Sequence, residues 1–475
     1  MNIEEVFNIT PSRRQYEWQR LEFYGFIHFG INTMTGREWG MGHEDLSLFN
    51  PNKLEASEWA ALFKQAGMRA MILTCKHHDG FCLWPSRYSL HTVAQTPWRN
   101  GRGDVVQDLA EACRQHGLKF GVYLSPWDRT ERSYGEGKNY DDFYVNQLTE
   151  LLTNYGEIGC VWLDGANGEG PNGKKQYYDW DRYYETIRRL QPQCVISVCG
   201  PDIRWVGNEA GHTRKEEWSV VPKLLQDVER ISEKSQQVDD GHFSRSFNSM
   251  DEDLGGREVV TGYRGEWIWY PAEVNTSIRP GWFYHEEEDQ QVRSDRELFD
   301  IYLNAVGGNA TFLLNVPPNK EGVIVQQDQE VLTRLGGRIA QLQDTSLVHN
   351  AEFTASSSKH PLDQFRELTD GRLEGCWQPD EDDREPWIQM TLPATIELNT
   401  IILQEQILHG QRVEAFEVWA VVDHGEWSRI AEGTIIGYKK IVRVPHTRAD
   451  RLKIVFKEFR HFPTLAHINL VKLED

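Results

Sequence analysis

One rhythm repeats from residue 20 to about residue 320: a short apolar run ends in polar or glycine residues, and an amphipathic helical stretch follows. Strands that alternate with helices pair in parallel and are covered by helices on both faces, so the pattern predicts a parallel α/β sheet. Charged and aromatic residues gather where the runs end, which favours a TIM-like (β/α) barrel over an open sheet. The runs are residues 24–30, 70–76, 119–125, 159–165, 194–200 and 311–316.

Helical stretches of amphipathic pattern lie between several of these runs, at residues 56–66, 104–116, 141–155 and 179–190. The second has clear end signals. Asp104 can cap the amino end, Val105, Leu109 and Cys113 recur at helical spacing, and Gly117 can end the helix. The helices are therefore predicted with defined ends.

The pattern changes near Asp344. Helical periodicity becomes scarce, and turn residues separate short alternating runs at 387–392, 400–407, 415–422, 440–445, 451–456 and 467–473. Such spacing is typical of an antiparallel β-sandwich. We predict a barrel over residues 1–345 and a β-sandwich over residues 346–475.

Charge and hydropathy exclude several classes of partner. The chain has 51 Lys and Arg against 72 Asp and Glu, a formal charge of −21, which disfavours nucleic acid and anionic lipid because both are polyanions. No run approaches the ~18 apolar residues of a membrane span. The first residues lack the apolar core of a signal peptide. We expect a soluble protein, periplasmic or secreted if a signal peptide was removed and otherwise cytoplasmic.

The seven cysteines have no CxxC spacing, which argues against a disulfide framework or a structural zinc site. Free thiols are the expectation, and they favour a reducing compartment.

Asp164 ends the apolar run GCVWLDG and precedes a glycine-rich loop, residues 165–173. An aspartate in that position can simply cap the next turn. At the carboxyl end of a barrel strand it can also be a nucleophile, a base or a metal ligand, and the glycines let backbone approach a ligand closely.

A second polar cluster, KHHDGF at residues 76–81, follows the run AMILTC. It can form a hydrogen-bonded network, bind a metal together with His28, or recognise a polyol, since neutral imidazoles both donate and accept. Successive strand side chains face opposite ways, so His77 and His78 are not expected to ligate one ion together. Polyol recognition is the preferred interpretation.

Two more clusters carry carboxylates: Glu38 beside Trp39 in GREWG, and Glu209 in GPDIRWVGNEAG. Glu209 lies 45 residues after Asp164 (209 − 164), the length of one βα unit, so we expect the two on adjacent strand ends. Two carboxylates in an aromatic pocket lined by histidines are the minimal equipment for glycoside hydrolysis.

The motifs FIHFG, GREWG, KHHDGFCLW, GVYLSPWD, VWLDGANGEGPNG and LLNVPPN together resemble the alpha-L-fucosidases of glycoside hydrolase family 29. The resemblance runs from about residue 16 to residue 325. The loops at 166–176 and 200–211, with SIRPGWFYH at 277–285, resemble the subfamily that prefers α-1,3/1,4-linked fucose on branched Lewis-type glycans.

The resemblance implies a retaining mechanism without a cofactor. Asp164 matches the nucleophile that forms a covalent fucosyl-enzyme, and Glu209 matches the acid/base of the α-1,3/1,4-specific subfamily. Glu273 is the alternative acid/base, followed by Glu216 and Glu217. The positions that match residues binding fucose hydroxyls or stacking on the ring are His28, Glu38, Trp39, His77, His78 and Tyr123, and Trp282 is the predicted wall for the fucose methyl group.

In the second domain, ELTDGRLEGCW at residues 367–377 resembles the start of a discoidin-like (coagulation factor 5/8 type C) sandwich. Such domains often bind calcium near this aspartate, so a structural calcium is one expectation. The acidic stretch at 380–383 could contribute, although a solvated loop is the preferred interpretation. The domain could equally bind sugar, form part of the active-site wall, or only cover the barrel.

The leading hypothesis is therefore an exo-fucosidase acting on terminal α-1,3/1,4-linked fucose of branched oligosaccharides. Three alternatives are a broad-specificity fucosidase, a non-catalytic fucose-binding lectin, and a metal-dependent hydrolase using His28, His77, His78 and Asp164. The presence of both Asp164 and Glu209 argues against a lectin, because binding needs neither a nucleophile nor a proton donor.

Overall fold

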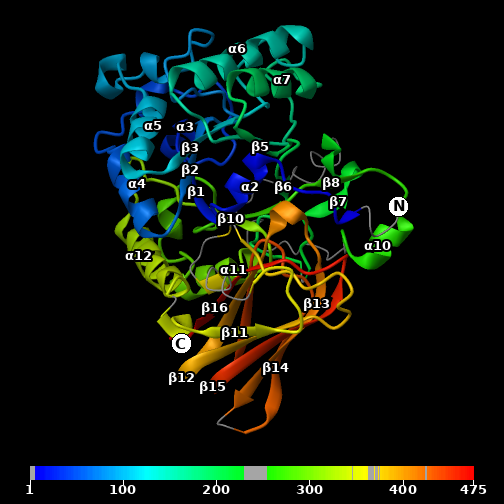
Figure 1. The fold of residues 1–475 in the computed structure, drawn as a ribbon. Coiled ribbons are helices and arrows are strands. Elements are labelled where there is room, and N and C mark those ends of the chain that lie inside the picture. Colours follow the sequence, from blue (N-terminus) through cyan, green and yellow to red (C-terminus); the bar gives the residue numbers. More distant parts are fainter. Residues whose placement is uncertain are drawn as a thin grey trace.

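The computed structural model describes residues 6–214, 216–228, 254–344, 346–361, 368–369, 373, 375–422 and 425–474. Eight parallel strands form the first domain: β1 (Phe23–Ile27), β2 (Ala70–Lys76), β3 (Lys119–Leu124), β4 (Cys160–Leu163), β5 (Val195–Val198), β6 (Arg204–Trp205), β9 (Ala272–Ser277) and β10 (Thr311–Asn315). Their order is β5-β4-β3-β2-β1-β10-β9-β6. A parallel bridge between Ser197 and Ile203 joins the two ends. The sheet is a nearly closed barrel, which confirms the predicted TIM-like fold (Figure 1).

The longer helices lie around the outside of this barrel (Figure 1). They are α4 (Ala56–Gln65), α5 (Val105–His116), α6 (Lys138–Asn154), α7 (Trp180–Leu190), α11 (Asp295–Ala305) and α12 (Gln326–Gln341), and the shorter ones are α2 (Arg13–Gln19), α3 (Ile31–Thr35) and α10 (Arg257–Gly262). Helix α5 has the predicted ends, because Asp104 accepts from Gln107 N at 2.9 Å and Gly117 adopts a φ of 67°. Within the described residues, no helix combines the length and the hydropathy that crossing a membrane requires.

Two barrel strands were not predicted. Strand β6 has only two residues, and β9 carries the buried polar side chains of Glu273, Asn275 and Ser277, so neither forms an apolar run. Residues 199–203 connect β5 to β6 without a helix, which departs from regular strand–helix alternation. The segment between β6 and β9 adds a small antiparallel pair, β7 (Val220–Pro222) and β8 (Trp267–Trp269).

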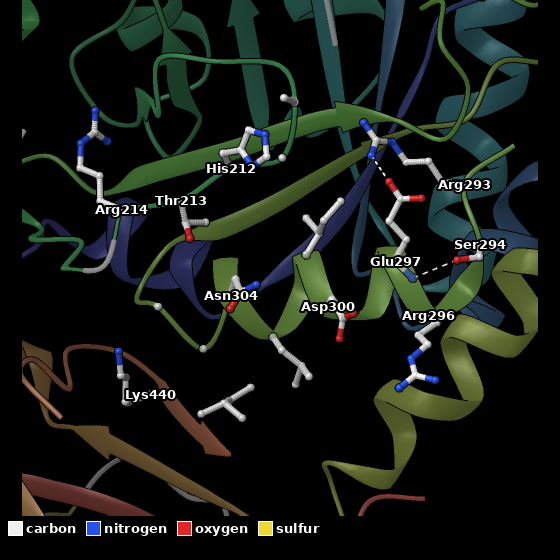
Figure 2. Close-up of a pocket in the computed structure, with 17 residues that line it drawn as sticks. His212, Thr213, Arg214, Arg293, Ser294, Arg296, Glu297, Asp300, Asn304 and Lys440 are labelled. Carbon is white, nitrogen blue, oxygen red and sulfur yellow. Dashed lines mark hydrogen bonds and ion pairs between the residues drawn. The ribbon is translucent and has the colours of Figure 1, made fainter. Parts of the chain in front are cut away.

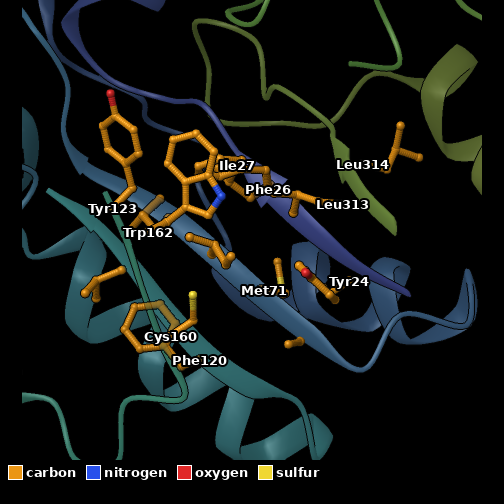
Figure 3. Packing of buried hydrophobic residues seen from close by; sticks show 14 of the residues in the cluster. Tyr24, Phe26, Ile27, Met71, Phe120, Tyr123, Cys160, Trp162, Leu313 and Leu314 are labelled. Atoms are coloured by element: carbon orange, nitrogen blue, oxygen red, sulfur yellow. The ribbon is translucent and has the colours of Figure 1, made fainter. Parts of the chain in front are cut away.

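Aromatic side chains from neighbouring strands fill the barrel (Figure 3). The ring of Phe26 on β1 lies 5.8 Å from that of Tyr123 on β3 and 5.3 Å from that of Trp162 on β4. The rings of Tyr123 and Trp162 are stacked at 5.5 Å. Close-packed rings of this size hold the strand ends in place, so the core positions the side chains that follow it.

In the described part of the second domain, the strands form a six-stranded sheet, and its antiparallel pairing agrees with the antiparallel strands predicted for the β-sandwich. Its strands are β11 (Glu352–Ala355), β12 (Trp387–Glu405), β13 (Val413–Val422), β14 (Trp427–Gly433), β15 (Lys440–Phe459) and β16 (Leu465–Val471). Strands β12 and β15 each join two of the predicted short runs. The residues between the β12 runs make a register shift between Thr391 and Ile396, and the strand continues past this irregularity.

The two domains share a packed interface. Ile402, Ile441 and Val471 of the second domain belong to the hydrophobic core of the barrel. Asn309 Oδ1, next to β10, accepts from Tyr438 N at 2.7 Å. Helix α12 ends at Gln341 and β11 begins at Glu352. The predicted boundary at residue 345 stays a prediction.

A buried ion pair anchors the loop after β9, which carries Trp282. Arg279 is fully buried, and its Nε and Nη2 donate to the two carboxylate oxygens of Asp328 on α12 at 2.9 and 3.0 Å. Arg279 Nη1 also pairs with Asp289 at 2.9 Å, so Asp328→Ala removes two hydrogen bonds to a buried charge that keeps one partner, and we expect it to destabilise the barrel by about 1–3 kcal/mol. Thermal unfolding measures this. Glu330→Ala, exposed on the same helix, is the control and should change the midpoint little; equal midpoints for both variants would contradict the prediction.

Candidate active site

The nine residues predicted to act on a substrate all lie at the carboxyl ends of barrel strands or in the loops that follow them. Parallel strands present their carboxyl ends on one face of a barrel, so loops distant in sequence converge there. The positions are His28 after β1, Glu38 and Trp39 after α3, His77 and His78 after β2, Tyr123 near the end of β3, Asp164 after β4, Glu209 after β6, and Trp282 after β9.

Contacts connect these residues into one site. The rings of His77 and Tyr123 are stacked at 5.6 Å, and the His28 ring lies 5.6 Å from that of His77. The Trp282 ring lies 5.0 Å from that of His28. On the other side of the site, the rings of Trp39 and His78 are 6.4 Å apart.

Asp164 is held by two hydrogen-bond donors. Tyr123 Oη donates to Asp164 Oδ2 at 2.9 Å, and the backbone N of Ala166 donates to Oδ1 at 2.8 Å. Burial and the adjacent carboxylate raise the pKa of Tyr123 well above its usual value, so the phenol keeps its proton and acts as a donor. The Asp164 side chain is 19% exposed, enough for a ligand to reach it. This geometry holds an accessible carboxylate in a fixed orientation.

Glu209 has the opposite environment. Burial, followed by the negative charge of Asp164, raises the pKa of Glu209 to about 8. The indole Nε1 of Trp282 donates to Glu209 Oε2 at 3.1 Å and opposes this shift only partly. With this pKa, Glu209 is mostly protonated at neutral pH.

The expected adjacency of these two strand ends was wrong. Asp164 follows β4 and Glu209 follows β6, with β5 between them in the sheet order. The interval of 45 residues (209 − 164) holds two strands because the connection from β5 to β6 has no helix. The two side chains still lie at the same face of the barrel, because both follow the carboxyl ends of parallel strands.

His28 is held by a residue that was quoted in a motif but given no role. Asn315, the last residue of β10, donates through Nδ2 to Trp282 O at 2.7 Å, so its Oδ1 accepts from His28 Nδ1 at 2.8 Å. Nε2 of His28 is then an acceptor. Burial lowers the pKa of His28 to about 3, so the ring is neutral. A lone asparagine in the apolar run TFLLNV was the available signal.

His78 is oriented by a similar relay. Ser125 Oγ donates to Trp127 O at 2.6 Å and so accepts from His78 Nδ1 at 2.7 Å. His78 Nε2 faces Asp164 Oδ2 at 3.8 Å, too far for a hydrogen bond. Burial lowers the pKa of His78 to about 4, although the negative charge of Asp164 acts to raise it. His78 Nε2 and Asp164 Oδ2 are thus two acceptors that face the same space. This arrangement suits a substrate hydroxyl that donates a hydrogen bond.

The expectation that His77 and His78 face opposite ways was wrong. Strand β2 ends at Lys76, so strand alternation does not apply to the two histidines, and their ring centroids are 4.1 Å apart. Burial lowers the pKa of His77 well below its usual value, which makes this ring neutral as well.

Glu38 anchors the loop after β9. Its carboxylate accepts from the backbone N of Trp282 at 2.9 Å and of Phe283 at 3.2 Å, and pairs with His285 Nε2 at 2.7 Å. The hydrogen bond to Glu38 raises the pKa of His285. His285 was not singled out in the sequence, because a histidine after aromatic residues carries no signal of its partner.

The alternative acid/base candidates, Glu273, Glu217 and Glu216, have environments that differ from that of Glu209. Glu273 is fully buried inside the barrel and accepts from Tyr24 Oη at 2.6 Å and Trp162 Nε1 at 2.8 Å. Glu217 is buried in ion pairs with Arg204 and Arg214. Glu216 is half-buried. Of these carboxylates, Glu209 is the one bonded to a predicted substrate-binding side chain.

Metal-ligand geometry occurs at a different place from the one considered in the sequence. Among residues that the structure describes, one group of three His, Cys, Asp or Glu side chains could hold an ion, and it consists of Glu44, Asp79 and His91. The alternative metal set of His28, His77, His78 and Asp164 is not brought together in this way.

The predicted calcium site of the second domain centres on Asp370, which lies outside the described residues, as does most of 367–372. In the acidic stretch at 380–383, Asp383 accepts from Ser357 Oγ at 2.6 Å and Glu381 pairs with Lys359 at 2.9 Å. These contacts occupy two of its four side chains.

A cavity of about 870 Å³ lies between the loop after β6, helix α11 and strand β15. Figure 2 shows His212 and Arg214 on one side of it, Asp300 and Asn304 on the helix, and Lys440 opposite. None of the nine predicted residues lines it. It is separate from the candidate active site.

Comparisons with known proteins agree with the fold and with the family resemblance. The alpha-L-fucosidase family model matches residues 10–341, and the F5/8 type C domain model matches residues 352–465. Alpha-L-fucosidase 1 of Arabidopsis thaliana is 39% identical over 97% of this chain and 87% of its own length. A Ruminococcus gnavus GH29 fucosidase solved with fucose has a TM-score of 0.83 and 28% identity, covering 98% of this chain and 96% of that one. A glycoside hydrolase 29 family member from a rumen bacterium has a TM-score of 0.78 and 35% identity, covering 98% and 78%.

Proposed function

This chain belongs to the alpha-L-fucosidase family of glycoside hydrolases, with a discoidin-like second domain, and we propose that it removes terminal α-1,3- or α-1,4-linked L-fucose from branched oligosaccharides with retention of configuration. The pair of carboxylates with contrasting environments supports the chemistry. The glycine-rich loop after β4 and the loop after β6 support the linkage preference through their resemblance to that subfamily.

In the proposed first step, Asp164 attacks the anomeric carbon and the glycosidic bond breaks, which forms a covalent fucosyl-enzyme. Tyr123 and the Ala166 amide hold the carboxylate oxygens in position. A carboxylate oriented by two donors loses little entropy on reaching the attack geometry.

Glu209 is the proposed proton donor to the departing oxygen. It then takes a proton from the water that attacks the fucosyl-enzyme, and returns to its starting state. Its pKa of about 8 is suited to this exchange at neutral pH, because the group can both give and regain a proton.

The three histidines are proposed to bind fucose hydroxyls. Neutral imidazoles accept from a hydroxyl on one nitrogen, and Asn315 and Ser125 set which nitrogen that is for His28 and His78. A hydroxyl pattern that leaves a buried acceptor unpaired loses about 1–3 kcal/mol per group. This supports discrimination of fucose from other sugars.

Fucose release from a Lewis-type trisaccharide, from 2'-fucosyllactose and from an aryl fucoside tests the proposal. We expect release from the Lewis sugar and little from the other two. Comparable release from all three would retain the fucosidase and refute the linkage preference. Tight fucose binding without any release would favour a lectin.

The pH profile provides a second test of Glu209. Its acid form is required, so kcat/KM should fall as the pH rises through about 8. The Trp282 N–H favours the ionised form, so Trp282→Phe is expected to raise the pKa of Glu209 and move this fall to higher pH. Trp39→Phe, which leaves that hydrogen bond intact, is the control. An unmoved or lowered limb in Trp282→Phe would contradict the assignment.

A further inference from the structure

Glu44, Asp79 and His91 meet in a buried space beside the candidate active site. Each offers one ligand atom, and the three atoms lie within 4.8 Å of one another. Asp79 is 2% exposed, and the side chains of His91 and Glu44 are 7% and 4% exposed. Glu44 lies in the loop after α3, Asp79 in KHHDGF after β2, and His91 in the segment before α5. Only the tertiary structure brings these three segments together.

Two buried polar atoms in this space, Glu44 Oε2 and His91 Nε2, make no hydrogen bond of good geometry, and they face each other at 3.6 Å. Asn32 Oδ1, another buried atom without a partner, lies near the other oxygen of Glu44, Oε1. A Cβ placed on Gly40 would lie 2.6 Å from Asn32 Oδ1, 2.6 Å from Asp79 Cβ and 2.8 Å from Glu44 Oε1. Buried polar atoms without partners are costly, and two that face each other indicate a missing ligand.

The second atoms of these side chains fix their orientation. Glu44 Oε1 accepts from the backbone N of Met41 and of Gly42, which leaves Oε2 for the shared space. Asn32 Nδ2 donates to Glu38 O at 3.0 Å, which identifies Oδ1 as its acceptor atom. Asp79 Oδ1 accepts from Phe81 N at 2.7 Å. The unpartnered atoms are therefore preorganised.

The spacing fits an ion better than a direct hydrogen bond. His91 Nε2 and Glu44 Oε2 are 3.6 Å apart, beyond a good hydrogen bond. Two ligands at about 2.0–2.2 Å from a tetrahedral ion are about 3.4 Å apart. Two carboxylates supply the negative charge that a divalent cation would neutralise.

We propose that Glu44, Asp79 and His91 bind one first-row divalent cation of the Zn²⁺ or Mn²⁺ class. An imidazole nitrogen among oxygen ligands suits these ions, whereas Ca²⁺ and Mg²⁺ prefer oxygen alone. The ion would join the loop after α3 to the KHHDGF loop, next to the backbone of Glu38. Its role is structural, and the site does not depend on the proposed reaction.

Metal content of the purified chain tests this directly. After treatment with a strong chelator, the protein is dialysed against Zn²⁺, Mn²⁺ or Ca²⁺, and bound metal is measured by mass spectrometry together with the thermal midpoint. We expect about one equivalent of Zn²⁺ or Mn²⁺ and a rise of the midpoint by several degrees. Uptake of neither ion would overturn the proposal.

Variants locate the ion. Glu44→Gln keeps the side-chain shape and an oxygen for the loop amides, and His91→Gln removes the nitrogen ligand. Each should weaken Zn²⁺ or Mn²⁺ binding by more than about tenfold, and His349→Ala, at an exposed histidine of the second domain, should not. Binding equal to wild type in both variants would overturn the assignment. A pH-dependent midpoint that metal leaves unchanged would identify a His91–Glu44 ion pair instead, and would also overturn it.

Discussion

Replacement of Asp164 by alanine is expected to lower kcat on every fucoside by about 10⁴-fold, the scale seen when a central catalytic group is removed. Of the two proposed catalytic carboxylates, Asp164 is the one whose two oxygens both accept from donors. Without it the covalent intermediate cannot form, and a good leaving group does not compensate. Fucose release measured on an activated aryl fucoside and on a Lewis-type sugar should fall alike.

Added azide sharpens this test. In Asp164→Ala, azide can occupy the vacated space and attack the anomeric carbon, which displaces the leaving group and gives a β-fucosyl azide of inverted configuration. Asp181→Asn, at an exposed position of α7, is the matched control and should retain activity. An Asp164→Ala enzyme within tenfold of wild type would refute the nucleophile assignment.

The second large effect is expected for Glu209→Ala and depends on the leaving group. Loss of a general acid costs about 10²–10⁴-fold, so release from a Lewis-type sugar should fall by that factor. An activated aryl fucoside needs no proton on its leaving oxygen, so its rate of fucosyl-enzyme formation, low in wild type because of the proposed linkage preference, should change little in this variant. Hydrolysis of the fucosyl-enzyme, which needs the base, should become slower.

Azide then distinguishes the two carboxylates by product. In Glu209→Ala it should attack the fucosyl-enzyme and give an α-fucosyl azide of retained configuration, with a faster turnover. Glu273→Gln is the comparison: it disturbs the contacts to Tyr24 and Trp162 inside the barrel, so it should lower stability without the leaving-group dependence. The reverse pattern would make Glu273 the acid/base.

The sequence predicted those parts of the fold whose signals are local. Asp104 and Gly117 mark the ends of α5 because capping involves residues within one turn. Strand β9 was missed because its polar residues find partners on other strands: Glu273 bonds to Tyr24 of β1 and Trp162 of β4. Burial of such residues is a property of the closed barrel, and no local pattern reports it.

For the candidate site, residue types at strand ends were enough to select Asp164, Glu209 and the histidines, because a barrel brings all carboxyl ends to one face. The protonation states were decided only by the tertiary structure. Burial beside Asp164 raises the pKa of Glu209 to about 8, and burial lowers that of His28 to about 3.

The sequence by itself thus determined the two-domain architecture and the chemistry available at the barrel mouth, since both follow from periodicity and residue type. Only the tertiary structure decided which acceptors lack partners. Glu44 Oε2 and His91 Nε2 meet in one space, although the two residues lie 47 positions apart in the sequence (91 − 44). The distances between these side chains and the dielectric around them depend on packing between distant parts of the chain. These two properties decide which polar residues act as acids, bases or ligands.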